Sequence, residues 1–188
     1  MNNQQAAVTT RSIETPSGHI SYNEAGSGPV ALFVHGVVMN KHIWHRQLAG
    51  LSDIRRCIAV DLLAHGDTEI SPAQDVSVTA NASMLRGVLD ALKIDQVDIV
   101  GNDSGGGISQ IFAALNRNRV RSLTLTNCDT HDNWPPEAFK PFVQMAIAGF
   151  QLPASFTPTV APNAMSVRRD SPRHMTVFPG GGSLARAR

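Results

Sequence analysis

One short segment, VGNDSGG at residues 100–106, carries the side chains of this sequence that best fit a catalytic role. A run of mostly β-branched, apolar residues leads into a glycine, and a polar triplet precedes a glycine-rich stretch with a helical pattern. A strand, a sharp turn and a helix in that order force the side chain at the top of the turn into a cleft, as a nucleophile requires. That side chain belongs either to Asp103 or to Ser104.

The residues that flank the turn distinguish the two registers. The positions two before and two after the nucleophile must be small, because larger side chains would collide there. With Ser104 at the centre, Asn102 takes one flank, and its side chain is too large. With Asp103 at the centre, the flanks are Gly101 and Gly105, and both fit. The pattern favours Asp103 as the nucleophile.

Two other interpretations of this segment stay open. Aspartate is a favoured N-cap residue, so Asp103 could serve only to cap the helix that follows the turn. Ser104 could instead act as the nucleophile of a serine-type esterase.

The segments around the turn alternate between strand and helix patterns. Strands are predicted over residues 19–26, 30–36, 55–62, 96–101 and 120–127, and helices over residues 41–51, 77–92 and 106–117. The continuous apolar run in VALFVHG is typical of a central strand buried on both faces. Strands that alternate with helices imply a largely parallel sheet covered on both sides, and reactive groups of such sheets collect beyond the carboxyl ends of the strands. The sequence predicts an open α/β fold.

Composition sets the broad class of the protein. The chain has 188 residues, of which 42% are hydrophobic and 16% charged, with a net charge of +1. These values predict a globular domain and give no reason to expect nucleic acid or a membrane as partner. Cys57 and Cys128 lie in apolar runs and are expected to be reduced thiols, which points to the cytoplasm. No histidine and carboxylate pattern has metal-ligand spacing, so no metal is expected.

The chain divides into three predicted parts. Residues 1–134 form the α/β core, residues 135–150 begin a helical lid, and residues 151–188 form a basic tail rich in proline and glycine. The tail has no apolar period and is expected to be irregular or disordered. The sheet would then end at the strand over 120–127, whose exposed edge invites self-association.

Several motifs in chain order resemble the α/β-hydrolase superfamily. They are HG at 35–36 followed by Trp44, DLLAHGDT at 61–68, VGNDSGG at 100–106, and LTLTNCDTHDNWPP at 123–136. The resemblance covers roughly residues 10–150. It points to the branch with an aspartate nucleophile, which includes epoxide hydrolases and haloalkane dehalogenases.

This resemblance implies a role for each matching residue. Asp103 would attack a carbon of a small organic substrate and form an alkyl-enzyme ester, without a cofactor. The backbone N–H groups of Ser104 and Val37 would form the oxyanion hole. The residues expected around the substrate pocket are His35, Gly36 and Trp44. His35 is expected to order the loop near the oxyanion hole rather than act as the base.

Departures from the family pattern leave the substrate open between an epoxide, a haloalkane and an ester. Many haloalkane dehalogenases have a halide-binding tryptophan directly after the nucleophile, where this chain has Ser104, and an asparagine where it has Val37. Epoxide hydrolases of this branch use paired tyrosines of the lid, and the only tyrosine here is Tyr22. The departures at Ser104 and Val37 disfavour dehalogenation, whereas the tyrosine count decides nothing, because most of the lid is expected to be missing.

The family order of nucleophile, acid and histidine is only partly matched. Asp129 is a candidate acid, although it could simply be a turn residue in CDTHDN. The only histidine beyond the predicted start of the lid is His174, which has no strand pattern to position it. We therefore expect a truncated or frameshifted copy of a longer hydrolase, in which the ester forms but is hydrolysed poorly. An inactive fragment or a binding module is the remaining alternative.

Overall fold

The computed structural model describes residues 7–128, 137, 140, 141 and 144, together with the backbone of two short strands near the C-terminus. The strands are β1 (Thr9–Thr15), β2 (Gly18–Ala25), β3 (Val30–Val34), β4 (Arg56–Val60), β5 (Val97–Asn102), β6 (Val120–Thr126), β7 (Met175–Phe178) and β8 (Ala185–Arg186). The helices are α1 (His45–Leu51), α2 (Val78–Ala91) and α3 (Ser104–Leu115), and the 3₁₀ turns are η1 (Lys41–Trp44) and η2 (Arg117–Arg119).

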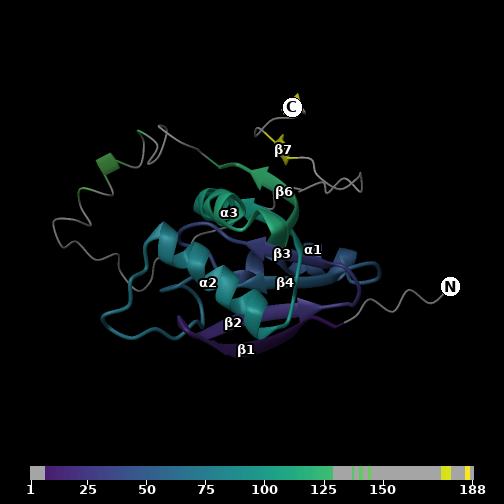
Figure 1. The fold of residues 1–188 in the computed structure, drawn as a ribbon, viewed down its shortest axis with the longest axis horizontal. Coiled ribbons are helices and arrows are strands. Elements are labelled where there is room, and N and C mark those ends of the chain that lie inside the picture. Colours follow the sequence, from purple (N-terminus) through teal and green to yellow (C-terminus); the bar gives the residue numbers. More distant parts are fainter. Residues whose placement is uncertain are drawn as a thin grey trace.

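The described strands form one open sheet in the order β1-β2-β4-β3-β5-β6-β7-β8 (Figure 1). Strands β4, β3, β5, β6 and β7 run parallel to their neighbours in this order, whereas β1, β2 and β8 pair antiparallel. From β3 to β6 the connections between successive strands contain α1, α2 and α3, as crossovers between parallel strands require. The predicted fold class, an open and mostly parallel α/β sheet, is confirmed.

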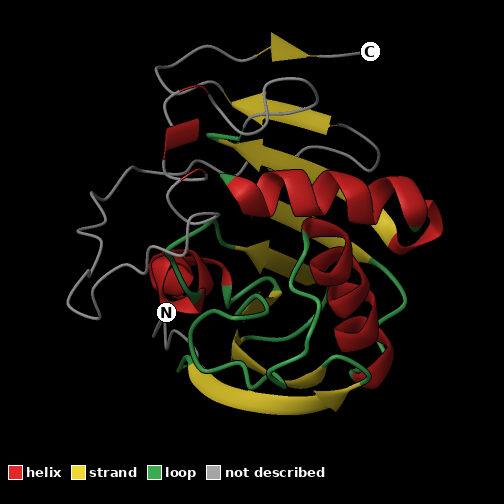
Figure 2. Cartoon of the chain, turned by 90° about the vertical axis from the view of Figure 1, so that its left-hand side faces the viewer, coloured by secondary structure: helices red, strands yellow, loops and turns green. Residues whose placement is uncertain are grey.

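Helices cover both faces of the sheet, with α2 and α3 on one side and α1 on the other (Figures 1 and 2). Alternate residues of β3 point to opposite faces, so Leu32 packs in the core under α2 and α3, while Phe33 packs under α1. Every residue of β3 is buried. This explains why its sequence is a continuous apolar run rather than an alternating one.

Each predicted strand and helix lies within two residues of an observed element at both ends. The segment 41–51 divides into η1 and α1. No strand was predicted before residue 19, because β1 reads TTRSIET and is mostly exposed, without an apolar alternation. Among the described residues no helix is long and apolar enough to span a membrane.

The C-terminal stretch differs from its prediction at six residues. Strands β7 and β8 lie within residues 151–188, where only irregular or disordered chain was expected. Strand β7 pairs with β6 from Leu123 to Thr126, so the edge expected to be exposed is covered there. The unpaired N–H and C=O groups of an edge strand can accept any extended segment, whatever its apolar pattern. Self-association through a sheet edge stays a prediction, and the predicted boundaries at 134 and 150 lie outside the described residues.

Candidate active site

Asp103 occupies the turn between β5 and α3 in a conformation that side chains rarely adopt. Its backbone has φ 51° and ψ −129°. The turn is held by two backbone hydrogen bonds, from the Asp103 N–H to the Thr126 carbonyl (3.1 Å) and from the Gly106 N–H to the Asp103 carbonyl (2.9 Å). A non-glycine residue in such a region costs about 1–3 kcal/mol and is concentrated at functional sites.

The two glycines that flank Asp103 have no room for a side chain. A Cβ on Gly101 would lie 2.7 Å from the Gly105 carbonyl oxygen and 2.7 Å from Ser109 Oγ. A Cβ on Gly105 would lie 2.2 Å from the carbonyl oxygen of His35, at the end of the neighbouring strand. The close approach of α3 to β3 and β5 therefore requires glycine at both positions, as the small-residue argument for Asp103 expects.

The side chains of Asp103 and Ser104 differ in their surroundings. Asp103 stands at the N-cap position of α3, but its side chain makes no capping hydrogen bond. Capping alone therefore does not account for an aspartate here. Ser104 is the first helical residue and is 8% exposed. Asp103, by comparison, is half-buried.

The His-Gly turn after β3 packs directly against the carboxylate of Asp103. A Cβ on Gly36 would lie 2.4 Å from Asp103 Oδ2, so only glycine lets the two segments approach this closely. Val37 follows with a half-buried side chain. Val38 has φ 54°, which is a strained conformation for a β-branched residue. The turn at residues 35–36 therefore lies against the side chain of Asp103.

His35 is fully buried and uses both nitrogens of its ring. The Leu62 N–H donates to Nε2 (3.1 Å), so the proton must be on Nδ1, which donates to the Gly36 carbonyl (2.8 Å). Burial lowers the pKa of His35 to about 4. The ring is thus neutral near pH 7, and its 3.9 Å distance to Asp61 is not an ion pair. His35 thus connects the turn after β3 to the loop after β4.

Trp44, another predicted site residue, packs in the core rather than at an open surface. Trp44 is 3% exposed and packs in the core beneath α1, with its ring centroid 5.2 Å from that of Phe33. This position leaves it little surface for a substrate. Asp129 and His174 lie outside the described residues.

Three charged residues near the site were missed by the sequence analysis. Lys41 is fully buried, and its Nζ lies 2.6 Å from a carboxylate oxygen of Asp61 and 2.6 Å from one of Asp67. A lysine between polar and aromatic residues gives no sign of burial. The sequence signal that could have revealed this pair is Asp61, because a carboxylate at the end of a buried strand needs a charged or hydrogen-bonding partner. Among the described residues no cluster of three potential ligands is placed to hold a metal ion.

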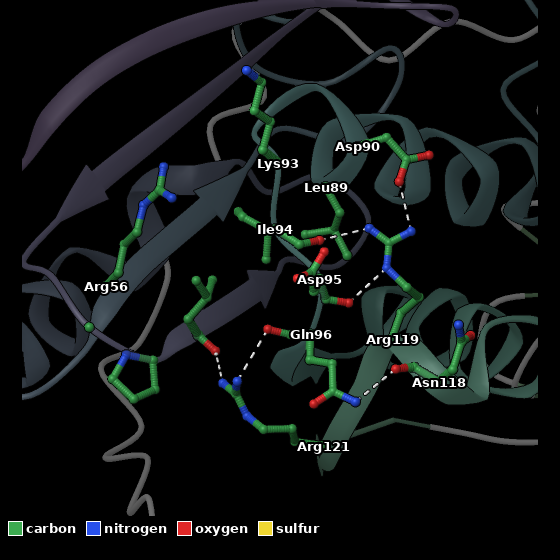
Figure 3. A pocket seen from close by; sticks show the side chains of 13 residues that line it. Arg56, Leu89, Asp90, Lys93, Ile94, Asp95, Gln96, Asn118, Arg119 and Arg121 are labelled. Atoms are coloured by element: carbon green, nitrogen blue, oxygen red, sulfur yellow. Dashed lines mark hydrogen bonds and ion pairs between the residues drawn. The ribbon is translucent and has the colours of Figure 1, made fainter.

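A cavity of about 910 Å³ lies at the opposite end of the sheet from Asp103 (Figure 3). It is bordered by the starts of β3, β4 and β6 and by the C-terminal end of α2. The guanidinium groups of Arg119 and Arg121 donate to backbone carbonyl groups here, among them those of Ile94 and Val30 (Figure 3). These arginines are engaged in joining elements, so the candidate active site remains with Asp103.

Comparison with known proteins agrees with this geometry. A family model described as "alpha/beta hydrolase fold" matches residues 29–181. The chain belongs to the α/β-hydrolase fold family. It is 42% identical over 101 residues to epoxide hydrolase 2 of Siraitia grosvenorii, which covers 52% of this chain and 32% of that protein. It is 37% identical over 105 residues to a haloalkane dehalogenase of Mesorhizobium japonicum, which covers 55% of this chain and 34% of that protein.

A solved structure of this α/β-hydrolase type extends the comparison. The structure of an N-acyl homoserine lactone degrading enzyme has a TM-score of 0.64 and 29% identity, covering 73% of this chain and 54% of that one. The region matched to the two curated relatives is about a third of their length.

Proposed function

We propose that the chain carries the nucleophile half of a hydrolase that acts on a small organic electrophile through Asp103. The observation that supports this most directly is the strained turn at Asp103, whose two flanking glycines cannot accept a Cβ and whose carboxylate lies against Gly36. The relatives named as epoxide hydrolase and haloalkane dehalogenase support the same class of chemistry.

In the proposed first step, a carboxylate oxygen of Asp103 attacks an electrophilic carbon of the substrate. A C–O bond forms, and the bond from that carbon to the leaving oxygen or halogen breaks with its electron pair. The leaving oxygen of an epoxide then takes a proton, whereas a halide leaves as the anion. The product is an alkyl ester of Asp103.

In the proposed second step, water attacks the ester carbonyl carbon and the alcohol leaves, which regenerates the carboxylate. The negative charge on the carbonyl oxygen would be held by the backbone N–H groups of Ser104 and Val37, each worth roughly 3–4 kcal/mol. The N-terminal end of α3 also favours negative charge at Asp103.

The second step needs a base, and His35 does not fit this role. Both of its nitrogens are engaged by backbone groups, and burial lowers its pKa to about 4. We propose that, where no other histidine supplies this base, the ester accumulates and turnover is slow. Asp129 as the orienting acid stays a prediction.

Among substrates, we favour an epoxide over a haloalkane. Ser104 and Val37 stand where many dehalogenases have halide-binding side chains, and the Ser104 side chain is largely buried. Ester or lactone cleavage through Ser104 is the second candidate, supported by the structural likeness to a lactone-degrading enzyme.

Covalent trapping distinguishes these proposals. The protein is incubated with a small terminal epoxide, a 1-haloalkane or an aryl ester, and the adduct is located by intact-mass and peptide mass spectrometry. We expect an alkyl adduct on Asp103 that is absent in Asp103→Asn. Ser104→Ala is the matched control, since it keeps the backbone N–H and should still be trapped. An acyl adduct on Ser104, or trapping that persists in Asp103→Asn, would contradict the proposal.

A further inference from the structure

Two neighbouring loops at the candidate site are connected at both ends. The loop after β3, residues 35–41, contains the proposed oxyanion donor, and the loop after β4 covers residues 61–68. At one end the Leu62 N–H donates to His35 Nε2 (3.1 Å). At the other end the Lys41 N–H donates to Asp61 Oδ1 (2.7 Å), and Lys41 Nζ donates to Asp61 Oδ2 (2.6 Å). The second connection therefore joins both the backbone and the side chain of Lys41 to a single carboxylate.

The carboxylate of Asp61 is fully buried and well paired. Besides its two bonds from Lys41, its Oδ2 accepts the Asp67 N–H (2.8 Å). Gly66 has φ 54°, and a Cβ there would lie 2.1 Å from Oδ2, so the loop wraps closely around the carboxylate. A buried ion pair with this many hydrogen bonds has a defined geometry, and removal of one partner leaves an uncompensated buried charge.

Lys41 remains charged in this environment. Burial lowers the pKa of its ammonium group, but the hydrogen bonds to Asp61 and Asp67 outweigh burial and raise the pKa above its usual value. The same lysine lowers the pKa of Asp67, whose side chain is 71% exposed. The ammonium group of Lys41 thus stays charged across the neutral range.

Between the two connections the loop adopts a strained conformation. Val38 has φ 54°, although its β-branched side chain disfavours this region. Such a conformation persists only where the surrounding contacts enforce it. Before Val38 the structure provides the contacts of His35, and after it those of Lys41 with Asp61. Asn40 adds local bonds, because its side chain accepts the His42 N–H (3.0 Å) and its carbonyl accepts the Ile43 N–H (3.2 Å).

We propose that Lys41 and Asp61 are positioning residues that hold the segment 37–40 in its strained conformation and so aim the Val37 N–H at the ester carbonyl of Asp103. The proposal rests on the proposed function of Asp103, because it assigns Val37 to the oxyanion hole. Its structural part, the control of the Val38 conformation, is independent of any activity.

The structural part is tested by NMR on the full chain, with scalar couplings that report φ at Val38. We expect a positive φ in the wild-type protein and a population with negative φ in Lys41→Met. Asp98→Asn is the matched control, because Asp98 also pairs with arginines but lies at the far end of β5. An unchanged Val38 φ in Lys41→Met would overturn the proposal.

A second variant keeps the proposal testable if Lys41→Met does not fold. The double variant Lys41→Met with Asp61→Leu removes both charges, and well-packed apolar replacements of buried ion pairs are often tolerated. We expect this variant to be more stable than Lys41→Met in urea, yet still to release Val38 from its positive φ. Retention of the positive φ in the double variant would contradict a positioning role.

The catalytic part is tested by the rate at which the alkyl ester of Asp103 is hydrolysed once it has formed. The ester is formed with the epoxide, excess reagent is removed, and the loss of the adduct is followed by intact-mass spectrometry. We expect Lys41→Met to slow this loss at least tenfold with little change in the rate of trapping, because charge develops in the oxyanion hole only during hydrolysis, whereas Asp98→Asn keeps both rates. If the wild-type chain is not trapped at all, the proposed function of Asp103 fails while the NMR test of the loop still stands. If the wild type is trapped and Lys41→Met loses the ester at the wild-type rate, the assignment of Lys41 fails alone.

Discussion

At the scale of single residues, the candidate site depends on two glycines, because a Cβ atom at either position would collide with its neighbours. Asp103 adopts its strained turn because α3 begins directly against the ends of β3 and β5, and this contact leaves no space for a Cβ at Gly101 or Gly105. Gly107, two residues further along the same helix, has no heavy atom within 4 Å of its Cβ position. The glycines of this stretch therefore serve different purposes.

This difference predicts opposite effects of the same substitution. Gly105→Ala should lower the free energy of unfolding by about 1–3 kcal/mol, because its methyl group would collide with backbone carbonyl oxygens. Gly107→Ala should raise it by about 0.5–1 kcal/mol, since alanine loses less conformational entropy in a helix. Urea denaturation of both variants measures these changes. Equal effects at the two positions would show that the contact between α3 and the end of β3 is looser than described.

At the scale of elements, an arginine joins three segments at the amino ends of the strands. Arg119, in η2, donates from Nε to the Asp95 carbonyl (2.8 Å) and from Nη2 to the Ile94 carbonyl (2.7 Å). Its Nη1 donates to Asp90 in α2 (2.7 Å) (Figure 3). The side chain thus connects the end of α2, the loop before β5 and the turn before β6.

These contacts predict that Arg119→Met lowers the free energy of unfolding by about 1–3 kcal/mol, because two carbonyl groups and a carboxylate lose a charged donor. Arg117→Met is the matched control, since Arg117 lies exposed in the same turn. Its effect should stay within about 0.5 kcal/mol. Urea denaturation measures both, and a similar loss in the two variants would argue that the bonds of Arg119 contribute nothing specific.

At the scale of the whole molecule, the buried neutral His35 makes stability depend on pH. Burial lowers its pKa from 6.5 to about 4. Between these values the unfolded chain binds a proton that the folded chain does not, so acid favours unfolding. The stabilising contribution is complete above pH 6.5 and is lost as the pH falls towards 4.

We therefore predict that the free energy of unfolding falls by on the order of 3 kcal/mol between pH 7 and pH 4 through His35 alone. Urea unfolding at a series of pH values measures it. In His35→Gln this part of the pH dependence should disappear, although the variant is less stable at pH 7. A profile in His35→Gln equal to that of the wild type would show that His35 does not titrate as described.

The fold was predictable to a large extent because burial leaves a periodic signal in the sequence. The strand and helix boundaries followed from apolar runs such as VALFV and from the spacing of apolar residues in α2. Strand β1 was missed because exposed antiparallel strands carry no such signal. The pairing of β7 with β6 was missed for a related reason, since backbone hydrogen bonds do not depend on side-chain type.

The sequence by itself determined the open α/β class and predicted Asp103 rather than Ser104 as the nucleophile, because both inferences depend on residue size and on spacing along the chain. Only the tertiary structure placed Gly36 against Asp103, moved Trp44 into the core, and paired Lys41 with Asp61. These relations join segments from different strands. Their geometry depends on how the sheet orders those strands and on which charges become buried between the loops. The spacing of residues along the chain determines neither the strand order nor the burial of these charges.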